Sequence, residues 1–191
     1  CFVVLAGRDR SLFLTLYPKF SIVNVNSTLT GLLNQEGGKD RIMIKQRVVV
    51  TGMGAVTPIG IGVPAYWDNL VKGTCGVAGI TRFDPQGLPV SIAAEVKDFV
   101  ATDFISKKLA RETDVFMHYA LVAAEEALQD SHLALENTRI GIVMGTSLSG
   151  AATIAETQRE QDARNGEWKV SPRFVPKVLG NIAASQIAIS H

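Results

Sequence analysis

The sequence has little of what several classes of protein require. It contains only two cysteines in 191 residues, Cys1 and Cys75, which is too few for a disulfide framework or a cysteine-based zinc site. Such a cysteine content fits a reducing compartment best. Glycine, proline and polar residues interrupt every apolar run before it reaches the roughly 18 residues that a membrane-spanning helix needs. We therefore expect no membrane span.

Charge of one sign is also lacking. Nineteen Lys and Arg residues against eighteen Asp and Glu residues leave a net charge of +1. A chain so nearly neutral has no global field that would draw it to nucleic acid or to an anionic membrane. We expect no nucleic-acid partner, and any basic docking surface has to be local.

What is present is an ordinary globular composition, 47% apolar and 19% charged, on a chain long enough for one domain with a sizeable core. Residues 1–42 contain apolar patches but no sustained helical or strand period, and they begin at Cys1. We interpret them as a non-domain extension, either upstream sequence translated by accident, which we favour, or part of a transit peptide. The domain is expected over residues 43–191. A bacterial cytoplasmic location is expected, while a plastid or mitochondrial one stays open.

From Met43 onward the pattern is typical of an α/β protein. Strands alternate with helices, which predicts a parallel or mixed layered sheet. The strands are expected at 48–50, covered on both faces, at 91–96 and at 139–144; the helices are expected from Pro64 to Gly73, at 106–130, at 150–164 and, buried, at 181–190. Small residues at Ala120, Ala123, Ala124 and Ala127 form a seam on the long helix, so we expect another backbone to pack closely against it.

The stretch RVVVTGMGAVTPIG, residues 47–60, raises the possibility of a dinucleotide-binding loop. That motif needs three closely spaced glycines opening a helix. Here the third glycine, Gly60, comes too late after Gly52 and Gly54, and Pro58 stands where the helix should have begun. A glycine-containing turn is the favoured interpretation.

Several separated motifs together carry a resemblance to a known family. They are RVVVTGMGAVTPIG (47–60), FDPQGLPVSIAAEVKDF (83–99), SKKLARETDVFMHYAL (106–121), GTSLSG (145–150) and SPRFVPKVLGNIAASQIAI (171–189). In this order they resemble the N-terminal half of the β-ketoacyl-acyl-carrier-protein synthases, in particular the elongating type II enzymes of fatty-acid synthesis. The resemblance runs from Met43 to His191.

The resemblance implies an α/β, thiolase-like layered fold, of which this chain holds the N-terminal half, in a protein that is usually a homodimer and needs no cofactor. It implies a decarboxylative Claisen condensation between an acyl-enzyme thioester and malonyl-carrier. The implied partners are an acyl carrier protein and acyl and malonyl thioesters. A cysteine thiolate would hold the acyl chain, and two histidines and backbone donors would stabilise charge.

No catalytic residue is expected within the chain itself. In the family, the nucleophilic cysteine and both histidines lie beyond the position that matches His191, so the chain alone is predicted to be inactive. Cys75 lies in KGTCGV, where a small side chain in a turn is the favoured interpretation, with no neighbouring histidine or lysine to activate it. His118, His132 and His191 are interpreted as structural or surface groups.

Two residues are implied to bind substrate. In the family, the residue that matches Leu148 lines the far end of the acyl pocket, and the one that matches Phe174 packs beside it. A branched side chain at the pocket floor would limit chain length by steric overlap. The simpler interpretation, that both are core or dimer-interface residues, stays open beside this one.

A local basic patch is implied to dock the carrier protein. It consists of Lys107, Lys108 and Arg111 at the start of the long helix, with Lys169 before the SPRFVP turn. Complementary charge raises the rate of encounter and fixes the register of docking. A merely solvated helix face is the alternative, and Glu112 and Trp168 stand where some relatives are basic.

Three other hypotheses remain at this point. One is a non-catalytic chain-length-factor-like partner of a condensing enzyme, which the residue at the nucleophile position would reveal. Another is a polyketide-type or initiating ketosynthase, although GTSLSG and SPRFVP favour the fatty-acid elongation group. The last is the nucleotide binder considered above, which a failure to bind NAD or NADP would exclude.

Overall fold

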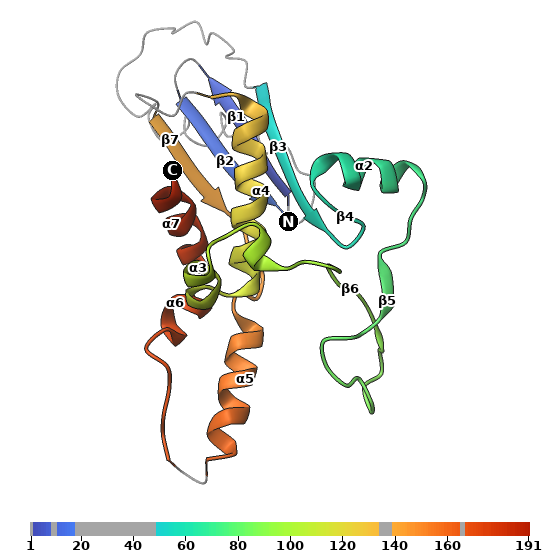
Figure 1. Ribbon diagram of the computed structural model, residues 1–191, viewed down its shortest axis with the longest axis vertical. Helices are drawn as coiled ribbons and strands as arrows, with labels where there is room; N and C mark the ends of the chain where they lie inside the picture. The colour runs from blue at the N-terminus through green and yellow to red at the C-terminus, as the bar shows by residue number, and fades with distance from the viewer. Residues whose placement is uncertain (1, 9–10, 18–48, 134–138, 165–166) are drawn as a thin grey trace, which may run out of the picture.

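A five-stranded sheet and a long helix lying across it form the upper part of the molecule (Figure 1). The computed structural model describes residues 2–8, 11–17, 49–133, 139–164 and 167–191. The sheet consists, in spatial order, of β4 (Gly60–Ile61), β3 (Val49–Thr57), β1 (Phe2–Arg8), β2 (Ser11–Tyr17) and β7 (Arg139–Met144). A second, two-stranded sheet pairs β5 (Val77–Gly79) with β6 (Ile92–Ala94).

The first two strands correct the interpretation of the N-terminal residues. β1 and β2 form an antiparallel hairpin; β1 pairs antiparallel with β3, and β2 pairs in parallel with β7. These two segments therefore form strands although their sequence shows no sustained strand period. A strand with neighbours on both sides reads as a continuous apolar run, and periodicity alone does not identify such a run as a strand. The proposed start of the domain at Met43 stays a prediction.

The helices largely follow the sequence pattern. They are α2 (Val63–Val71), α3 (Lys107–Glu112), α4 (Val115–Ser131), α5 (Ala151–Asp162), α6 (Phe174–Val178) and α7 (Asn181–Ser190), with a 3-10 turn η1 (Ala101–Asp103) before α3. The predicted helices after Pro64, over 150–164 and over 181–190 are confirmed, as are the strands at 91–96 and 139–144. No helix in the described part of the chain combines the length and the apolar character needed to cross a membrane.

The single long helix predicted over 106–130 is wrong, because the chain breaks it between Glu112 and Val115. Thr113 has an extended backbone, and the Asp114 carboxylate accepts a hydrogen bond from the Phe116 N–H (3.3 Å), which caps the start of α4. An aspartate in this position satisfies an N–H group that the first turn leaves free. The basic residues therefore lie on a separate short helix, α3, and not at the start of α4.

The core lies where α4 packs against β3. Ala120, Ala123, Ala124 and Ala127 are all fully buried, so the predicted seam is confirmed. A Cβ built on Gly54 would lie 1.9 Å from the Ala123 carbonyl oxygen, and one on Gly52 would lie 2.1 Å from that of Ala127. The two glycines therefore lie within strand β3 and allow the helix backbone to approach it. The expected glycine-containing turn is wrong, because the strand continues to Thr57.

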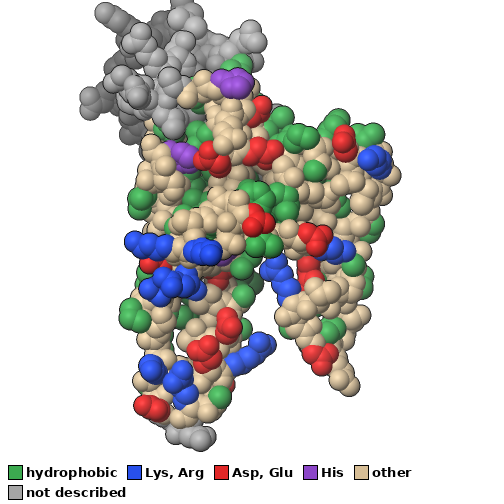
Figure 2. Space-filling view, viewed as in Figure 1, with side chains coloured by type: hydrophobic (Ala, Val, Ile, Leu, Met, Phe, Trp, Pro, Cys, Tyr) green, Lys and Arg blue, Asp and Glu red, His purple; other side chains and the backbone are tan. Residues whose placement is uncertain are grey.

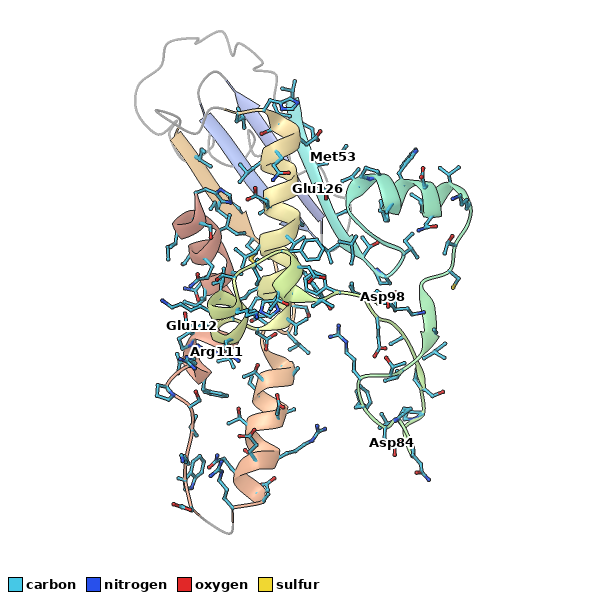
Figure 3. All side chains as sticks on the ribbon, viewed as in Figure 1. Met53, Asp84, Asp98, Arg111, Glu112 and Glu126 are labelled. Carbon is cyan, nitrogen blue, oxygen red and sulfur yellow. The ribbon has the colours of Figure 1, made fainter. Side chains whose placement is uncertain are left out.

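Two carboxylates of α4 satisfy backbone donors of the neighbouring elements. The N–H of Met53 donates to Asp130 (2.9 Å), and the N–H of Ala55 donates to Glu126 (2.8 Å). The other oxygen of Glu126 accepts from the N–H of Val63 at the start of α2 (2.7 Å). Glu126, labelled in Figure 3, thus joins α4, β3 and α2.

Apolar side chains of the sheet are exposed, among them Val50 of β3 and Val143 of β7. Val50 and Val143 are more than half exposed, at 55% and 57%, so the expectation that the first strand is covered on both faces is wrong. Helix α4 packs against β3, and α7 packs against β7. The expected burial of α7 holds for Ala183 and Ile187, whereas Ile189 is exposed.

Candidate functional site

The loop GTSLSG, residues 145–150, connects β7 to α5 and packs against the end of α6. The Ser149 hydroxyl donates to the Val178 carbonyl oxygen (3.3 Å). A Cβ on Gly150, whose φ is +62°, would lie 2.5 Å from the Cα of Val178, and one on Gly180 would lie 2.9 Å from Thr146. Glycine at 150 lets the loop backbone meet the backbone of α6, and glycine at 180 leaves room for the side chains of Thr146 and Ser149. The structure therefore brings this loop and the α6 region into one unit.

The two residues implied to line an acyl pocket belong to this unit. Leu148 lies in the loop and is 82% exposed, and Phe174 is the first residue of α6 and is half-buried. The loop and α6 are thus neighbours. A pocket role for Leu148 and Phe174 stays a prediction.

The basic residues of α3 lie on the surface beside α6. Lys107, Lys108 and Arg111 are exposed, and the helix begins where the Ser106 hydroxyl accepts from the Leu109 N–H (3.2 Å). Figure 2 shows Lys and Arg side chains gathered over α3 and α6, on the left of the molecule.

Helix α6 adds two cations that the sequence analysis missed, Arg173 before its first residue and Lys177 in its last turn. Their spacing of four residues, across one helical turn, was the available signal. We call the exposed cations of α3 together with Arg173 and Lys177 the basic face.

Lys169, predicted to dock the carrier together with the cations of α3, is bonded through its backbone to Gln161 of α5. Its N–H donates to the side-chain oxygen of Gln161 (3.0 Å), and its carbonyl oxygen accepts from the Gln161 amide (2.7 Å). These bonds fix it to the end of α5, and no described contact joins it to α3. Its docking role stays a prediction.

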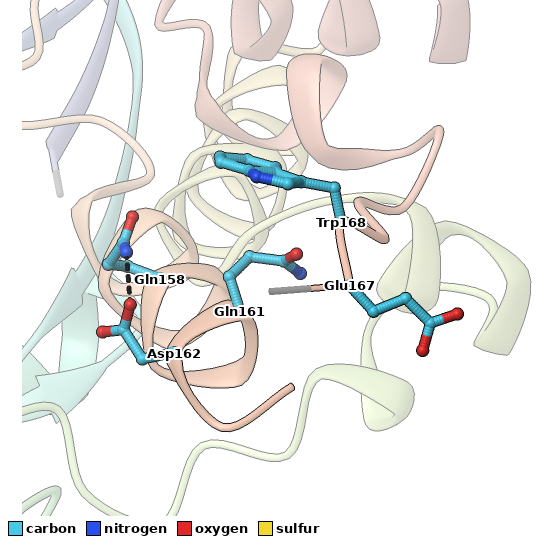
Figure 4. Close-up of a pocket in the computed structure, with 5 residues that line it drawn as sticks. All are labelled: Gln158, Gln161, Asp162, Glu167 and Trp168. Carbon is cyan, nitrogen blue, oxygen red and sulfur yellow. Dashed lines mark hydrogen bonds between the residues drawn. The ribbon is translucent and has the colours of Figure 1, made fainter. Parts of the chain in front are cut away.

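A shallow depression of about 300 Å³ lies at this end of α5 (Figure 4). It is lined by Gln158, Gln161, Asp162, Glu167 and Trp168. Trp168 is 81% exposed, and the lining is polar and acidic, so the depression does not suit an acyl chain or an acidic partner.

A buried polar cluster lies behind α3. His118 is 7% exposed, and its Nε2 has no hydrogen-bond partner among the described residues. Burial lowers the pKa of His118 below its ordinary value, an effect that the Asp114 carboxylate one turn earlier partly opposes. Asp114 is itself buried and accepts a hydrogen bond from the Thr153 hydroxyl of α5. The cluster ties the start of α4 to α5, which supports the structural interpretation of His118.

The remaining cysteine and histidines of the described chain do not form a catalytic constellation. Cys75 is exposed after α2, where its thiol contacts the Val77 carbonyl oxygen (3.8 Å). His132 ends α4 in a left-handed conformation, and His191 Nε2 lies 3.3 Å from Glu125. Among the described residues, no group of three His, Cys, Asp or Glu side chains could hold a metal ion. The expectations that Cys75 is not a nucleophile and that no cofactor is needed stay predictions.

Comparison with known proteins gives a consistent result. A family model described as the N-terminal domain of β-ketoacyl synthase matches residues 45–191. The chain is 44% identical over 147 residues to the 3-oxoacyl-[acyl-carrier-protein] synthase 2 of Staphylococcus aureus, covering 75% of this chain and 35% of that protein. It is 38% identical over 154 residues to the enzyme of the same name from Coxiella burnetii, covering 78% and 36%. The chain thus spans about a third of the length of these relatives.

Several solved structures have a fold similar to that of this chain. The ishigamide ketosynthase/chain length factor superposes with a TM-score of 0.61 at 25% identity, over 74% of this chain and 36% of that one. A β-ketoacyl synthase from Burkholderia phymatum gives 0.61 at 24% identity, over 75% and 36%. The ketosynthase AntDE, solved in complex with the acyl-carrier protein AntF, gives 0.58 at 24% identity, over 74% and 39%.

These neighbours confirm the expected thiolase-like α/β fold for the matched part of the chain. The matched residues include the loop at 145–150, α3 and α6, so the elements that form the candidate site all lie within the family's domain. The chain belongs to the β-ketoacyl synthase family, of which residues 45–191 represent the N-terminal domain.

Proposed function

We propose that this chain supplies the carrier-docking surface and part of the acyl-binding site of a condensing enzyme that elongates acyl chains in fatty-acid synthesis. The observation that carries the proposal is the family match over residues 45–191, together with 44% identity to a 3-oxoacyl-[acyl-carrier-protein] synthase 2. The nucleophile and the two histidines are proposed to come from residues that this sequence does not contain. The chain by itself is therefore expected to catalyse no condensation.

The reaction proposed for the whole enzyme has two transfers. A cysteine thiolate attacks the acyl thioester of the carrier, and the carrier thiol leaves. A second carrier brings a malonyl thioester, which loses CO₂; the resulting carbanion attacks the acyl-enzyme carbonyl and releases the cysteine thiolate. The product is a 3-oxoacyl-carrier two carbons longer than the starting chain. Backbone and histidine donors would stabilise the negative charge that develops on the thioester oxygens.

The acyl-binding role is proposed for Leu148 and Phe174. The close approach of the loop to α6, with the Ser149 bond to Val178 and the two glycines at their crossing, supports a joint role for these elements. Leu148 is 82% exposed in this chain, so its side chain is available to form one wall of a site that further residues complete. Each methylene buried there would contribute about 0.8 kcal/mol.

The docking role is proposed for Lys107, Lys108 and Arg111. Three exposed cations on a six-residue helix give a dense local charge on a chain whose net charge is only +1. An acidic acyl carrier protein would be attracted to this point of the surface and oriented by it. Lys169, at the end of α5, is proposed as a second and separate contact.

A polyketide-type ketosynthase or its chain-length-factor partner is the second candidate. The similarity in fold to the ishigamide ketosynthase/chain length factor favours it, at 25% identity. The fatty-acid enzyme is preferred because the curated relatives at 38% to 44% identity are synthases of that kind. We also propose that the longer fatty-acid enzyme is a homodimer.

Binding of an acyl carrier protein tests the docking proposal directly. The dissociation constant of the 191-residue chain for a fluorescently labelled acyl carrier protein would be measured by anisotropy at low and at physiological ionic strength. Replacing Lys108 and Arg111 by glutamate should weaken binding at least tenfold, or about 1.4 kcal/mol. Lys72→Glu, an exposed charge reversal at the end of α2, serves as the control and should change little. Equal effects of the two changes would contradict the proposal.

A further inference from the structure

One ion pair links the proposed docking helix to the helix that begins with Phe174. A guanidinium nitrogen of Arg173 lies 4.0 Å from a carboxylate oxygen of Glu112, and the two side chains are 51% and 36% exposed. Glu112 is the last residue of α3, next to Arg111, as Figure 3 shows. Arg173 immediately precedes Phe174. The pair therefore joins the last residue of α3 to the residue that precedes α6.

Glu112 is an acidic residue on a surface that is otherwise basic. It is the one acid among the six residues of α3, beside three exposed cations, and it faces a fourth cation on the other helix. While it is paired, the charge of Arg173 is largely neutralised for any approaching acidic partner. Without the Glu112 carboxylate, Arg173 and Lys177 would extend the positive potential of α3 across to α6.

The strength of the pair decides whether it can open. Exposed ion pairs at this separation contribute little to stability, because water and salt screen both groups. A carrier carboxylate that arrives already oriented by the other cations can therefore replace Glu112 as the partner of Arg173 at little cost. A buried pair would not exchange in this way, because breaking it would leave a charge desolvated and unpaired.

We infer that Arg173 is a further carrier-docking residue, which Glu112 masks until an acidic carrier protein binds to α3. The inference rests on the proposed docking function. Docking then exchanges the Glu112–Arg173 pair for a contact between Arg173 and the carrier, and frees the N-terminal end of α6 from α3. Phe174 follows directly, so the same exchange loosens the element proposed to border the acyl site.

A double-mutant cycle on carrier binding tests this inference with the whole 191-residue chain. Glu112→Gln should tighten binding of the labelled acyl carrier protein roughly fivefold, since it removes an opposing charge and unmasks Arg173. Arg173→Gln should weaken binding roughly threefold. When both changes are combined, the gain from Glu112→Gln should shrink to less than about twofold, because there is no longer a masked cation to release.

The control is Asp84→Asn, which removes one negative charge on the separate limb that carries β5 and β6 (Figure 3). It should leave the affinity nearly unchanged. If Glu112→Gln tightens binding equally with and without Arg173, Glu112 acts through net charge alone and the masking is refuted. If Arg173→Gln has no effect in either background, Arg173 is not a docking residue.

A failure of the docking proposal itself would look different. In that case the unmodified chain would not bind the carrier protein, or Lys108→Glu would leave its affinity unchanged. All the substituted side chains are at least a third exposed or lie in turns, and circular dichroism of each variant would establish that the fold is kept.

Discussion

Replacing Gly54 by alanine should separate α4 from β3. The added Cβ would lie 1.9 Å from the Ala123 carbonyl oxygen, whereas an ordinary contact begins near 3.4 Å, so the helix would have to withdraw by about 1.5 Å. The obstacle is backbone, and no side-chain rotamer can relieve it. A gap of about 0.5–1 Å already forfeits a quarter to a half of the dispersion energy between two surfaces. The wider gap here would forfeit more than that along the seam, whose alanines are all fully buried. We expect a loss of about 3 kcal/mol in the free energy of unfolding.

The assay is urea denaturation, monitored by far-ultraviolet circular dichroism. The dependence of the unfolding free energy on urea concentration is measured for each protein. Gly79→Ala is the matched control, because Gly79 also lies in a strand and a Cβ there meets nothing within 4 Å. That change should stay within about 0.5 kcal/mol of the unmodified chain. A loss for Gly54→Ala no greater than that of the control would refute the account of how strand and helix pack.

Three further outcomes follow from the structure. Glu126→Ala should lower the free energy of unfolding by about 1–3 kcal/mol, because it leaves the N–H groups of Ala55 and Val63 without their acceptor. Glu126→Gln should lose less stability, because its amide oxygen can still accept one of the two bonds; equal losses would argue against the bridging role. Burial lowers the pKa of His118 in the folded chain, so the unfolded chain binds the proton more tightly. The stability that this group contributes is therefore fully present above about pH 6.5 and is lost as the pH falls through the folded pKa. His118→Gln should reduce this dependence of the unfolding free energy on pH, as measured by urea titrations across that range. Cys75→Ser should leave both stability and carrier affinity within about 0.5 kcal/mol of the unmodified chain, and a larger change would mean that the exposed thiol has a role we have not assigned.

Some of the fold could be predicted because local chemistry determines it. The alanines of α4 recur at helical spacing, and their side chains are too small to keep another backbone away. This pattern predicted a close backbone contact, which the structure shows to be with β3. Pro64 in the first turn of α2 set the start of that helix, and the β-branched run before Gly52 set a strand. These features depend on neighbours in the sequence.

Other features depended on partners far along the chain. Whether Val50 is covered is decided by what lies on the second face of the sheet, and a β-branched run reads the same in either case. The break at Thr113 and Asp114 was hidden inside an otherwise helical pattern, although an aspartate before a new apolar run is a cap signal that could have been used. The hairpin of β1 and β2 depends on its pairing with β3 and β7, which no local pattern contains.

The candidate site divides along the same line. The cations of α3 could be recognised because they are consecutive or one turn apart on one short helix. The inclusion of Arg173 and the separation of Lys169 could not, because both depend on side chains of other helices, Glu112 and Gln161.

Hydrogen–deuterium exchange of the chain, with and without a saturating acyl carrier protein, tests the central claim most directly. The account predicts slower exchange in residues 106–112 and 171–178, which contain the basic face, and no change over residues 77–94, which contain β5 and β6. Protection confined to other segments, or no protection at all at saturating carrier, would contradict the claim that this face of the β-ketoacyl synthase domain receives the carrier.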